Sequence, residues 1–414
     1  MDFENKYTKE QGNFRREVRA WLEANIPENM QMPTDPEDFS EDMYWFWRQK
    51  HKEMAAKGWL FPTYPKEYGG GGLTGEHETI IEEESQRFRV PRHFCTDWIL
   101  PALLVWGTEE QKKKWLVPFL KGEQVAWEKF TEPHSGSDLA SYQSHAVREG
   151  DEWVINGANV FVSGRHAPYP DWLYGPVVSD PDAPRHRNLA YLIIPYPTPG
   201  VEIKKLKLTN GSDQHFVYLD NVRIPADHLI GNDHQGWQVA NTSLEQEHGG
   251  RGQAFPSDDV VDNLIAYVQE HLKKSQSPGG DPVLQQEAAD AFIDGHIHNL
   301  FARRTYWMYM SRVEMSWEGP CTSLFGRNYG MRNVARVRDV MGPYALLGTK
   351  DPIAPCGGGQ EVDQRSSFIH QHGAGSRNIN KVLLARRIGI SRTRERAAVT
   401  PMTAGRREKQ QEAD

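Results

Sequence analysis

Cysteine, excess positive charge and long apolar runs are all scarce in this sequence of 414 residues. Its 3 cysteines lie far apart, which excludes a disulfide framework and a cysteine-ligated zinc site. The 48 Lys and Arg residues are outnumbered by 56 Asp and Glu, and this net charge of −8 provides no basic surface for nucleic acid. No segment reaches the roughly 18 uninterrupted apolar residues of a membrane span. The segment Met1–Lys6 carries charges where a signal peptide needs an apolar run, so we expect a cytoplasmic protein.

Two tempting signals carry little weight. The histidines of each pair, His296/His298 and His370/His372, are two residues apart and point away from each other on a helix, so we predict no metal site. The segment Gly70–Gly75 matches the G-x-G-x-x-G pattern of dinucleotide-binding proteins. Charged residues and a proline precede it where that pattern requires a buried strand, so we expect no such fingerprint.

The hydrophobic period changes twice along the chain. Apolar residues such as Val18 and Leu22 recur at helical spacing near the start, short β-type runs occupy about 152–225, and long helical patterns return after Trp237. We therefore predict an α+β fold with an N-terminal helical domain, a middle β domain and a C-terminal helical bundle. The four predicted units are the helical domain 1–126, the β domain 127–236, the helical domain 237–392 and a flexible tail 393–414.

The segment Thr131–Asp138, here called the box, reads Thr-Glu-Pro-His-Ser-Gly-Ser-Asp. About twenty residues later a glycine-punctuated strand pair ends at Asn159–Gly164. A turn fixed by proline, a glycine that permits close approach and hydroxyls beside an aromatic strand can hold a flat ring with polar edges. Taken alone, the same residues would also suit an ordinary turn and hairpin.

The order and spacing of these segments resemble the flavin-binding core of the acyl-CoA dehydrogenase superfamily. Four further segments are similar to family motifs in the same order, and they are Pro65–Gly70, Trp106–Lys112, Val222–Ala226 and Gly231–Trp237. The resemblance implies FAD as cofactor and a three-domain fold. It also implies α,β-desaturation of an acyl-CoA thioester, in which a carboxylate removes the α proton and hydride passes to flavin N5.

The resemblance implies roles for individual residues of this chain. Thr131 would offer a hydroxyl and a backbone contact at the pyrimidine edge of the isoalloxazine, Phe161 would pack against the ring, and Ser163 would lie near N5. Ser137 sits where the family contacts the CoA moiety of the thioester. We therefore predict flavin contacts from Phe130, Thr131, Ser137, Phe161 and Ser163.

The catalytic base departs from the commonest family pattern. Most members carry a glutamate in a C-terminal loop, but Ala374 stands at that position here. Some members, including steroid-active ones, place the base on the helix after the β domain, where this chain has Glu247. We predict Glu247 as the base rather than Glu245, which lies about 200° round the same helix. His248 replaces the arginine that usually follows, and we predict that it contributes to substrate binding.

Other departures concern the approach to the box and the adenosine half of the FAD site. Glu128, Lys129 and Phe130 occupy the approach, where relatives commonly have an aromatic residue two or three positions before the box. The family's Arg-x-x-Phe-Gly is missing from 273–280, and Asp339–Pro343 replaces its Gln-x-x-Gly-Gly. These half-sites resemble the α2β2 steroid-degrading branch, in which a homologous second subunit supplies the adenosine contacts.

The prediction is thus the catalytic half of a heterotetramer acting on a bulky, steroid-derived acyl-CoA. An electron-transfer flavoprotein would accept its electrons. Two alternatives stay open from the sequence, namely a non-catalytic partner subunit of a heteromeric acyl-CoA dehydrogenase, and an acyl-CoA or nitroalkane oxidase of the same fold.

Overall fold

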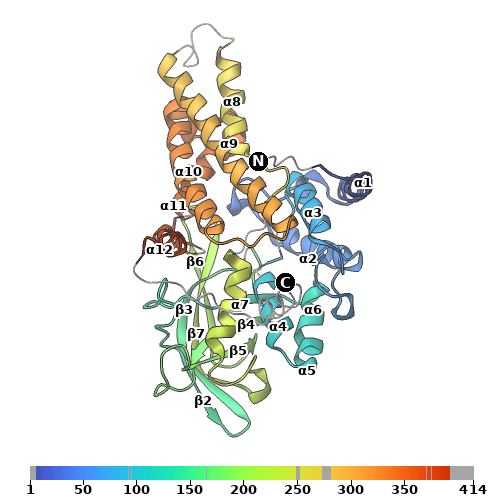
Figure 1. Ribbon diagram of the computed structural model, residues 1–414, viewed down its shortest axis with the longest axis vertical. Coiled ribbons are helices and arrows are strands. Elements are labelled where there is room, and N and C mark those ends of the chain that lie inside the picture. Colours follow the sequence, from blue (N-terminus) through green and yellow to red (C-terminus); the bar gives the residue numbers. More distant parts are fainter. Residues whose placement is uncertain are drawn as a thin grey trace.

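The computed structural model describes residues 6–91, 93, 94, 96–164, 166–248, 252–272, 281–369, 371–373 and 375–391, with the backbone alone at 245–248, 271 and 272. Figure 1 shows three parts: N-terminal helices, a twisted β sheet at one end, and a long helical bundle that projects from the opposite end. The predicted α+β fold with its helix, sheet and helix order is confirmed.

The N-terminal helices follow the predicted apolar spacing. Val18 and Leu22 are both buried on α1, which begins after a capping box at Thr8. The carboxylate of Glu84 on α3 is fully buried and pairs with Arg15 at 2.5 Å and Arg19 at 2.8 Å on α1. The helices of this part are α1 (Lys9–Asn25), α2 (Glu41–Ala56), α3 (Gly75–Arg87), α4 (Leu100–Trp106), α5 (Glu109–Gln111), a π-helical turn (Lys112–Leu116) and α6 (Val117–Leu120).

The motif Gly107–Lys112 joins the N-terminal helices to the β domain. The hydroxyl of Thr108 caps α5 by accepting from the backbone N–H of Gln111 at 3.2 Å. The Gln111 side chain is buried and donates to the carbonyls of Asp227 at 2.8 Å and Leu229 at 2.7 Å. The motif therefore fastens the N-terminal helices to the end of the β domain.

The β domain is one seven-stranded sheet. Its order is β1-β4-β2-β3-β7-β6, and β5 pairs with the other edge of β4. β1 and β2 run parallel to β4 and the other pairs are antiparallel. β5 is buried at six consecutive residues because both its faces are covered, whereas the outermost strand β6 has no fully buried residue. The strands are β1 (Ala126–Glu128), β2 (His145–Glu149), β3 (Glu152–Val162), β4 (Trp172–Val178), β5 (Leu189–Pro195), β6 (Val201–Lys207) and β7 (Asp213–Pro225).

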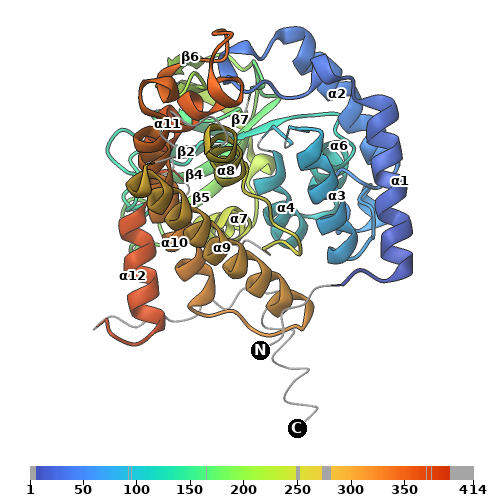
Figure 2. The ribbon, with the colours of Figure 1, turned by 90° about the horizontal axis from the view of Figure 1, so that it is seen from above.

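The C-terminal part contains α7 and a bundle with its own small core. α7 lies against β5 and α4 and shares the main core through Val239 and Ala240. α8, α9 and α10 enclose a second core that includes Leu264, Ala291 and Val337. The view from above places the N-terminal helices and the bundle on opposite sides, with α4 and α7 between them (Figure 2). The helices are α7 (Gly236–His248), α8 (Asp259–Leu272), α9 (Pro282–Met310), α10 (Glu318–Met341), α11 (Gly359–Ile369) and α12 (Arg377–Arg387).

One predicted helix is wrong at its end. The apolar pattern predicts a single helix from Leu284 to about Trp317, but α9 ends at Met310 and Arg312 adopts a positive φ of 54°. The left-handed residue ends the helical path, and the apolar pattern did not predict the separate helix α10 that follows. Among the described residues, no helix is long and apolar enough to cross a membrane.

Candidate active site

The box forms a tight turn directly after β1. Glu132 donates its backbone N–H to the carbonyl of Ser135 at 2.8 Å, and Ser135 returns the bond to Glu132 at 3.1 Å. The hydroxyl of Ser135 donates to the carbonyl of Asp138 at 2.7 Å, which fixes the second half of the turn. An added Cβ at Gly136 would meet nothing within 4 Å, so this part of the box faces open space. The exposed Ser137 follows it.

The glutamate of the box has a structural task. Its side chain is buried, and its carboxylate accepts from the backbone N–H groups of Gln143 at 2.7 Å and Ser144 at 2.8 Å. A buried N–H without an acceptor costs free energy. Glu132 therefore supplies the acceptor for the N–H groups just before β2, and these bonds also hold the turn in place.

The box and the end of β3 meet as the sequence resemblance predicts. Val160 donates its N–H to the carbonyl of Thr131 at 2.9 Å. The buried Asn159 side chain donates from Nδ2 to the carbonyls of Lys129 at 3.2 Å and Thr131 at 3.4 Å. These contacts bring Thr131 beside the strand end that carries Phe161 and Ser163.

Phe161 has the surface expected of a residue that receives a ligand. The strand register shifts between Asn159 and Val162, and Phe161 adopts a positive φ of 58°. Phe161 is 53% exposed, whereas Trp127 and Phe130 on the neighbouring segment are buried. The exposed Phe161 ring offers an apolar face, and half-buried Thr131 and Ser163 offer hydroxyls in the adjoining segments.

Phe130 lies differently from the other predicted contacts. It is buried, and its ring meets the edge of Tyr191 at a centroid distance of 6.2 Å. Phe130 therefore supports the box from the side of β5. Its predicted flavin contact stays a prediction, as do those of Thr131, Ser137, Phe161 and Ser163.

The helix that bears Glu247, α7, is anchored to Tyr191 on β5, the same residue that Phe130 contacts. The fully buried Ser243 places its hydroxyl 3.0 Å from that of Tyr191, and Thr242 accepts from the indole N–H of Trp106 at 3.0 Å. Positions four apart share one face of a helix, so position 247 lies one turn beyond Ser243 on the face directed toward β5. The side chains of Glu247 and His248 lie outside the described residues, as does Ala374, and their roles stay predictions.

The buried groups around the box have displaced pKa values. Burial, with a smaller contribution from the Glu128 carboxylate, raises the pKa of Tyr142 and Tyr191 well above the usual range. Both phenols are therefore neutral at pH 7. Burial lowers the pKa of the Lys129 ammonium to about 8, and the Glu132 carboxylate opposes that shift.

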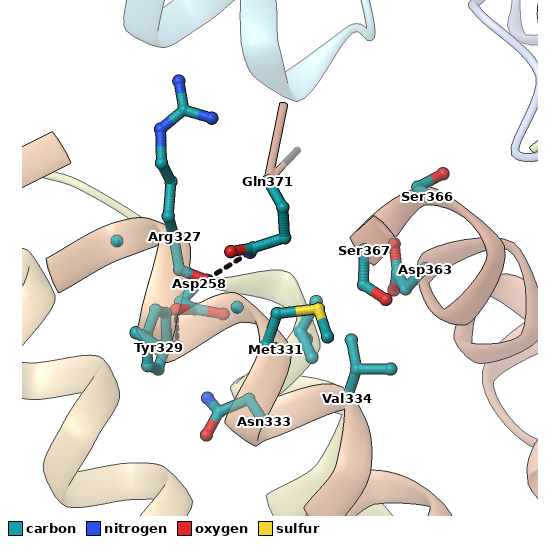
Figure 3. A pocket seen from close by; sticks show the side chains of 13 residues that line it. Asp258, Arg327, Tyr329, Met331, Asn333, Val334, Asp363, Ser366, Ser367 and Gln371 are labelled. Atoms are coloured by element: carbon teal, nitrogen blue, oxygen red, sulfur yellow. Dashed lines mark hydrogen bonds between the residues drawn. The ribbon is translucent and has the colours of Figure 1, made fainter. Parts of the chain in front are cut away.

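A separate cavity of about 220 Å³ opens in the C-terminal bundle (Figure 3), and no predicted site residue lines it. Its walls come from α10, α11 and the residues at the start of α8. Asp258 accepts from the Tyr329 hydroxyl, and Gln371 donates to the carbonyl of Arg327 at 2.8 Å. Burial, then Asp259 and Asp258, raise the pKa of the Asp363 carboxyl to about 6. In the described part of the chain, no cluster of metal-ligating side chains is present.

Comparisons with known proteins agree with these features. Residues 8–123 match the acyl-CoA dehydrogenase N-terminal domain, and residues 128–222 match the acyl-CoA dehydrogenase middle domain. The chain belongs to the acyl-CoA dehydrogenase family. The predicted family and the predicted class, an FAD-dependent acyl-CoA dehydrogenase, are therefore confirmed.

Similar proteins include several mycobacterial acyl-CoA dehydrogenases. IpdE1 of Mycolicibacterium smegmatis is 28% identical over 80% of this chain and 86% of its own, and FadE29 of Mycobacterium tuberculosis is 31% identical over 67% and 68%. The Tcur3481-Tcur3483 steroid ACAD aligns with a TM-score of 0.80 and 25% identity over 95% and 100% of the two chains. The ChsE4-ChsE5 complex of M. tuberculosis gives 0.79 and 23% over 94% and 99%.

Replacing Glu132 with alanine should destabilise the protein by roughly 2–4 kcal/mol, because the N–H groups of Gln143 and buried Ser144 lose their acceptor. Glu132→Gln retains one carbonyl oxygen as an acceptor, so its stability should lie between those of the wild type and Glu132→Ala. Thermal and urea unfolding measure the difference, with the exposed Glu202→Ala as the control. If Glu132→Ala unfolds at the wild-type midpoint, the bonds of Glu132 to the two N–H groups do not stabilise the fold.

Asp363→Asn should stabilise the protein at pH 7 but not at pH 4. The folded-state pKa of about 6 lies above the usual 3.8, so the folded chain binds this proton more tightly than the unfolded chain. Stability from this group is present at low pH and falls as pH rises from about 4 to 6. The gain at pH 7 is at most about 3 kcal/mol. Melting curves at pH 4 and pH 7 should show a gain in melting temperature for Asp363→Asn at pH 7 only. Asp339→Asn, at an exposed position on α10, should show no gain at either pH.

Proposed function

We propose that this chain is the catalytic subunit of a heteromeric acyl-CoA dehydrogenase that desaturates a bulky, steroid-derived acyl-CoA thioester between its α and β carbons. The observation that carries the proposal is the junction of the box with β3. There, Asn159 and Val160 hold the Thr131 carbonyl beside an aromatic residue that is 53% exposed.

The residues present fit an isoalloxazine. Phe161 offers an uncovered apolar face, Thr131 and Ser163 offer hydroxyls beside it, and Gly136 leaves room for close approach. In this proposal these residues hold FAD, while Ser137 contacts the CoA portion of the thioester. When bound, FAD supplies the hydride acceptor at N5.

The base in this proposal is Glu247 on α7. Its helix is fixed to β5 by the Ser243–Tyr191 contact and to α4 by the Thr242–Trp106 bond, so the backbone at position 247 is held against the same wall as the box. Removal of the proton α to a thioester carbonyl needs a positioned carboxylate, and in this proposal Glu247 supplies it. His248, the next residue, would contact the substrate.

A homologous partner subunit completes the proposal. Asp339 and Pro343 are exposed at the end of α10, and they offer a carboxylate and no N–H where a diphosphate would need donors. α9 exposes Phe292, Ile293 and Leu300 on the bundle surface, which suits contact with another chain. The similar ChsE4-ChsE5 structure is itself a complex of two different chains. In this α2β2 assembly an electron-transfer flavoprotein would take the electrons, in the cytoplasm.

The same exposed Asp339 and Pro343 also favour a second candidate, a non-catalytic subunit that supports an active partner. The two functions differ in whether Glu247 reacts. A non-catalytic subunit would tolerate its loss, whereas a catalytic subunit would not.

Glu247→Gln should lower the rate of flavin reduction by a factor on the order of 10² or more, because the amide keeps the side-chain shape but cannot take the α proton. Rapid mixing of the flavin-loaded assembly with substrate measures this step directly. Glu245→Gln on the same helix is the matched control and should reduce at the wild-type rate. Normal reduction by Glu247→Gln would favour the non-catalytic role.

Co-expression with the partner should yield a tetramer with about one FAD for every two chains, because each unlike pair completes one site. Released flavin absorbance against protein mass from light scattering gives the ratio. The chain expressed alone should retain little flavin, since half of the binding contacts are absent. A yellow homotetramer with one FAD per chain would contradict the heteromer but leave the dehydrogenase activity standing.

A further inference from the structure

Lys129 is a charged residue with no exposed surface, two residues before the box in the chain. Its backbone N–H donates to the carbonyl of Tyr174 on β4 at 2.9 Å, and its own carbonyl accepts from Asn159 on β3 at 3.2 Å. A Cβ added at Gly175 would come within 2.7 Å of that carbonyl, so only glycine permits β4 to approach this closely. β3 and β4 therefore fix the backbone of Lys129, which follows the end of β1.

The ammonium of Lys129 is incompletely neutralised. Its Nζ donates to the neutral carbonyl of Pro176 at 3.4 Å, and no carboxylate among the described residues forms an ion pair with it. Glu132 contributes an attractive charge, but both oxygens of its carboxylate accept backbone N–H groups. With the pKa lowered only to about 8, the group stays mainly protonated at pH 7. A buried cation of this kind exerts a strong field because water does not screen it.

Burying an ammonium is costly, and the geometry of the site suggests what offsets the cost. The Asn159 side chain joins the backbone carbonyls of Lys129 and Thr131, so the main chain that carries the ammonium is tied to the start of the box. The ammonium itself is held by the Pro176 carbonyl on β4. In the proposed reaction, hydride brings two electrons and one proton to the flavin, while the α proton goes to Glu247. The flavin ring therefore gains one negative charge on reduction.

We propose that Lys129 is an electrostatic positioning residue for the flavin, whose buried ammonium stabilises the negative charge that the ring acquires on reduction. This inference rests on the proposed function, because it requires a flavin on the box. It assigns a role to a residue that neither forms the flavin-facing surface nor takes part in proton abstraction. The alternative is that Lys129 only fills space between β1, β3 and β4.

The two roles are separated by the midpoint potential of the bound flavin. Lys129→Met keeps an unbranched chain of similar length but removes the charge, and Lys129→Arg keeps the charge. Lys207→Met removes one charge from an exposed position on β6 and is the control for net charge. Each variant is prepared as the flavin-loaded assembly with its partner chain and titrated with a reductant and reference dyes.

Lys129→Met should make reduction about tenfold less favourable, which corresponds to a potential about 30 mV more negative for a two-electron couple. Lys129→Arg and Lys207→Met should stay close to the wild-type potential. Lys129→Gln serves as a second neutral variant if the methionine variant does not fold, as judged by its melting curve.

An unchanged potential in the flavin-loaded neutral variants would overturn the electrostatic role and leave the proposed function intact. An equal fall in potential in Lys207→Met would overturn it as well, since the effect would then reflect net charge. A wild-type assembly that holds no flavin would overturn both this inference and the proposed function.

Discussion

The candidate site depends on the hydrogen bonds made by Asn159. This fully buried amide joins the Lys129 carbonyl, one residue past β1, to the Thr131 carbonyl that begins the box. The neighbouring Val160 N–H binds the same Thr131 carbonyl. Buried carbonyls need donors, so the box can follow β1 only where β3 supplies them. The register shift beyond Asn159 then exposes Phe161 at the end of the strand. One buried side chain thus connects strand pairing with the shape of the ligand face.

The sequence predicted the residues of this junction but not its mechanics. The turn at Pro133 and the aromatic strand end at Phe161 were visible, and their pairing came from a family resemblance rather than from local patterning. In the structure Glu132 is a buried acceptor for two N–H groups. From the sequence alone it looks the same as an exposed glutamate in a turn. Its burial depends on β2, which begins ten or more residues later, and such long-range contacts have no local signature.

The C-terminal bundle was harder to predict for a different physical reason. α10 carries Gly319, Gly326 and Gly330 together with many charged residues, and glycine weakens the helical signal. Its helical form depends on packing against α9 and α11, where Val337 and Val340 enter the second core. The aspartates of the bundle cavity were also missed. Asp258 precedes the apolar start of α8, and a capping pattern was the available signal, whereas Asp363 had none.

The two cores divide the molecule in a way that matches the proposed roles. α7 contributes Val239 and Ala240 to the same core as the β sheet and the N-terminal helices, so the box and the helix that bears Glu247 belong to one packed unit. Among its described residues the bundle has a small core of nine buried residues, and α9 exposes several large apolar side chains. A unit with a small core gains most from burying such a surface against another chain. The proposed catalytic geometry can therefore stay fixed while the bundle is adapted to a partner.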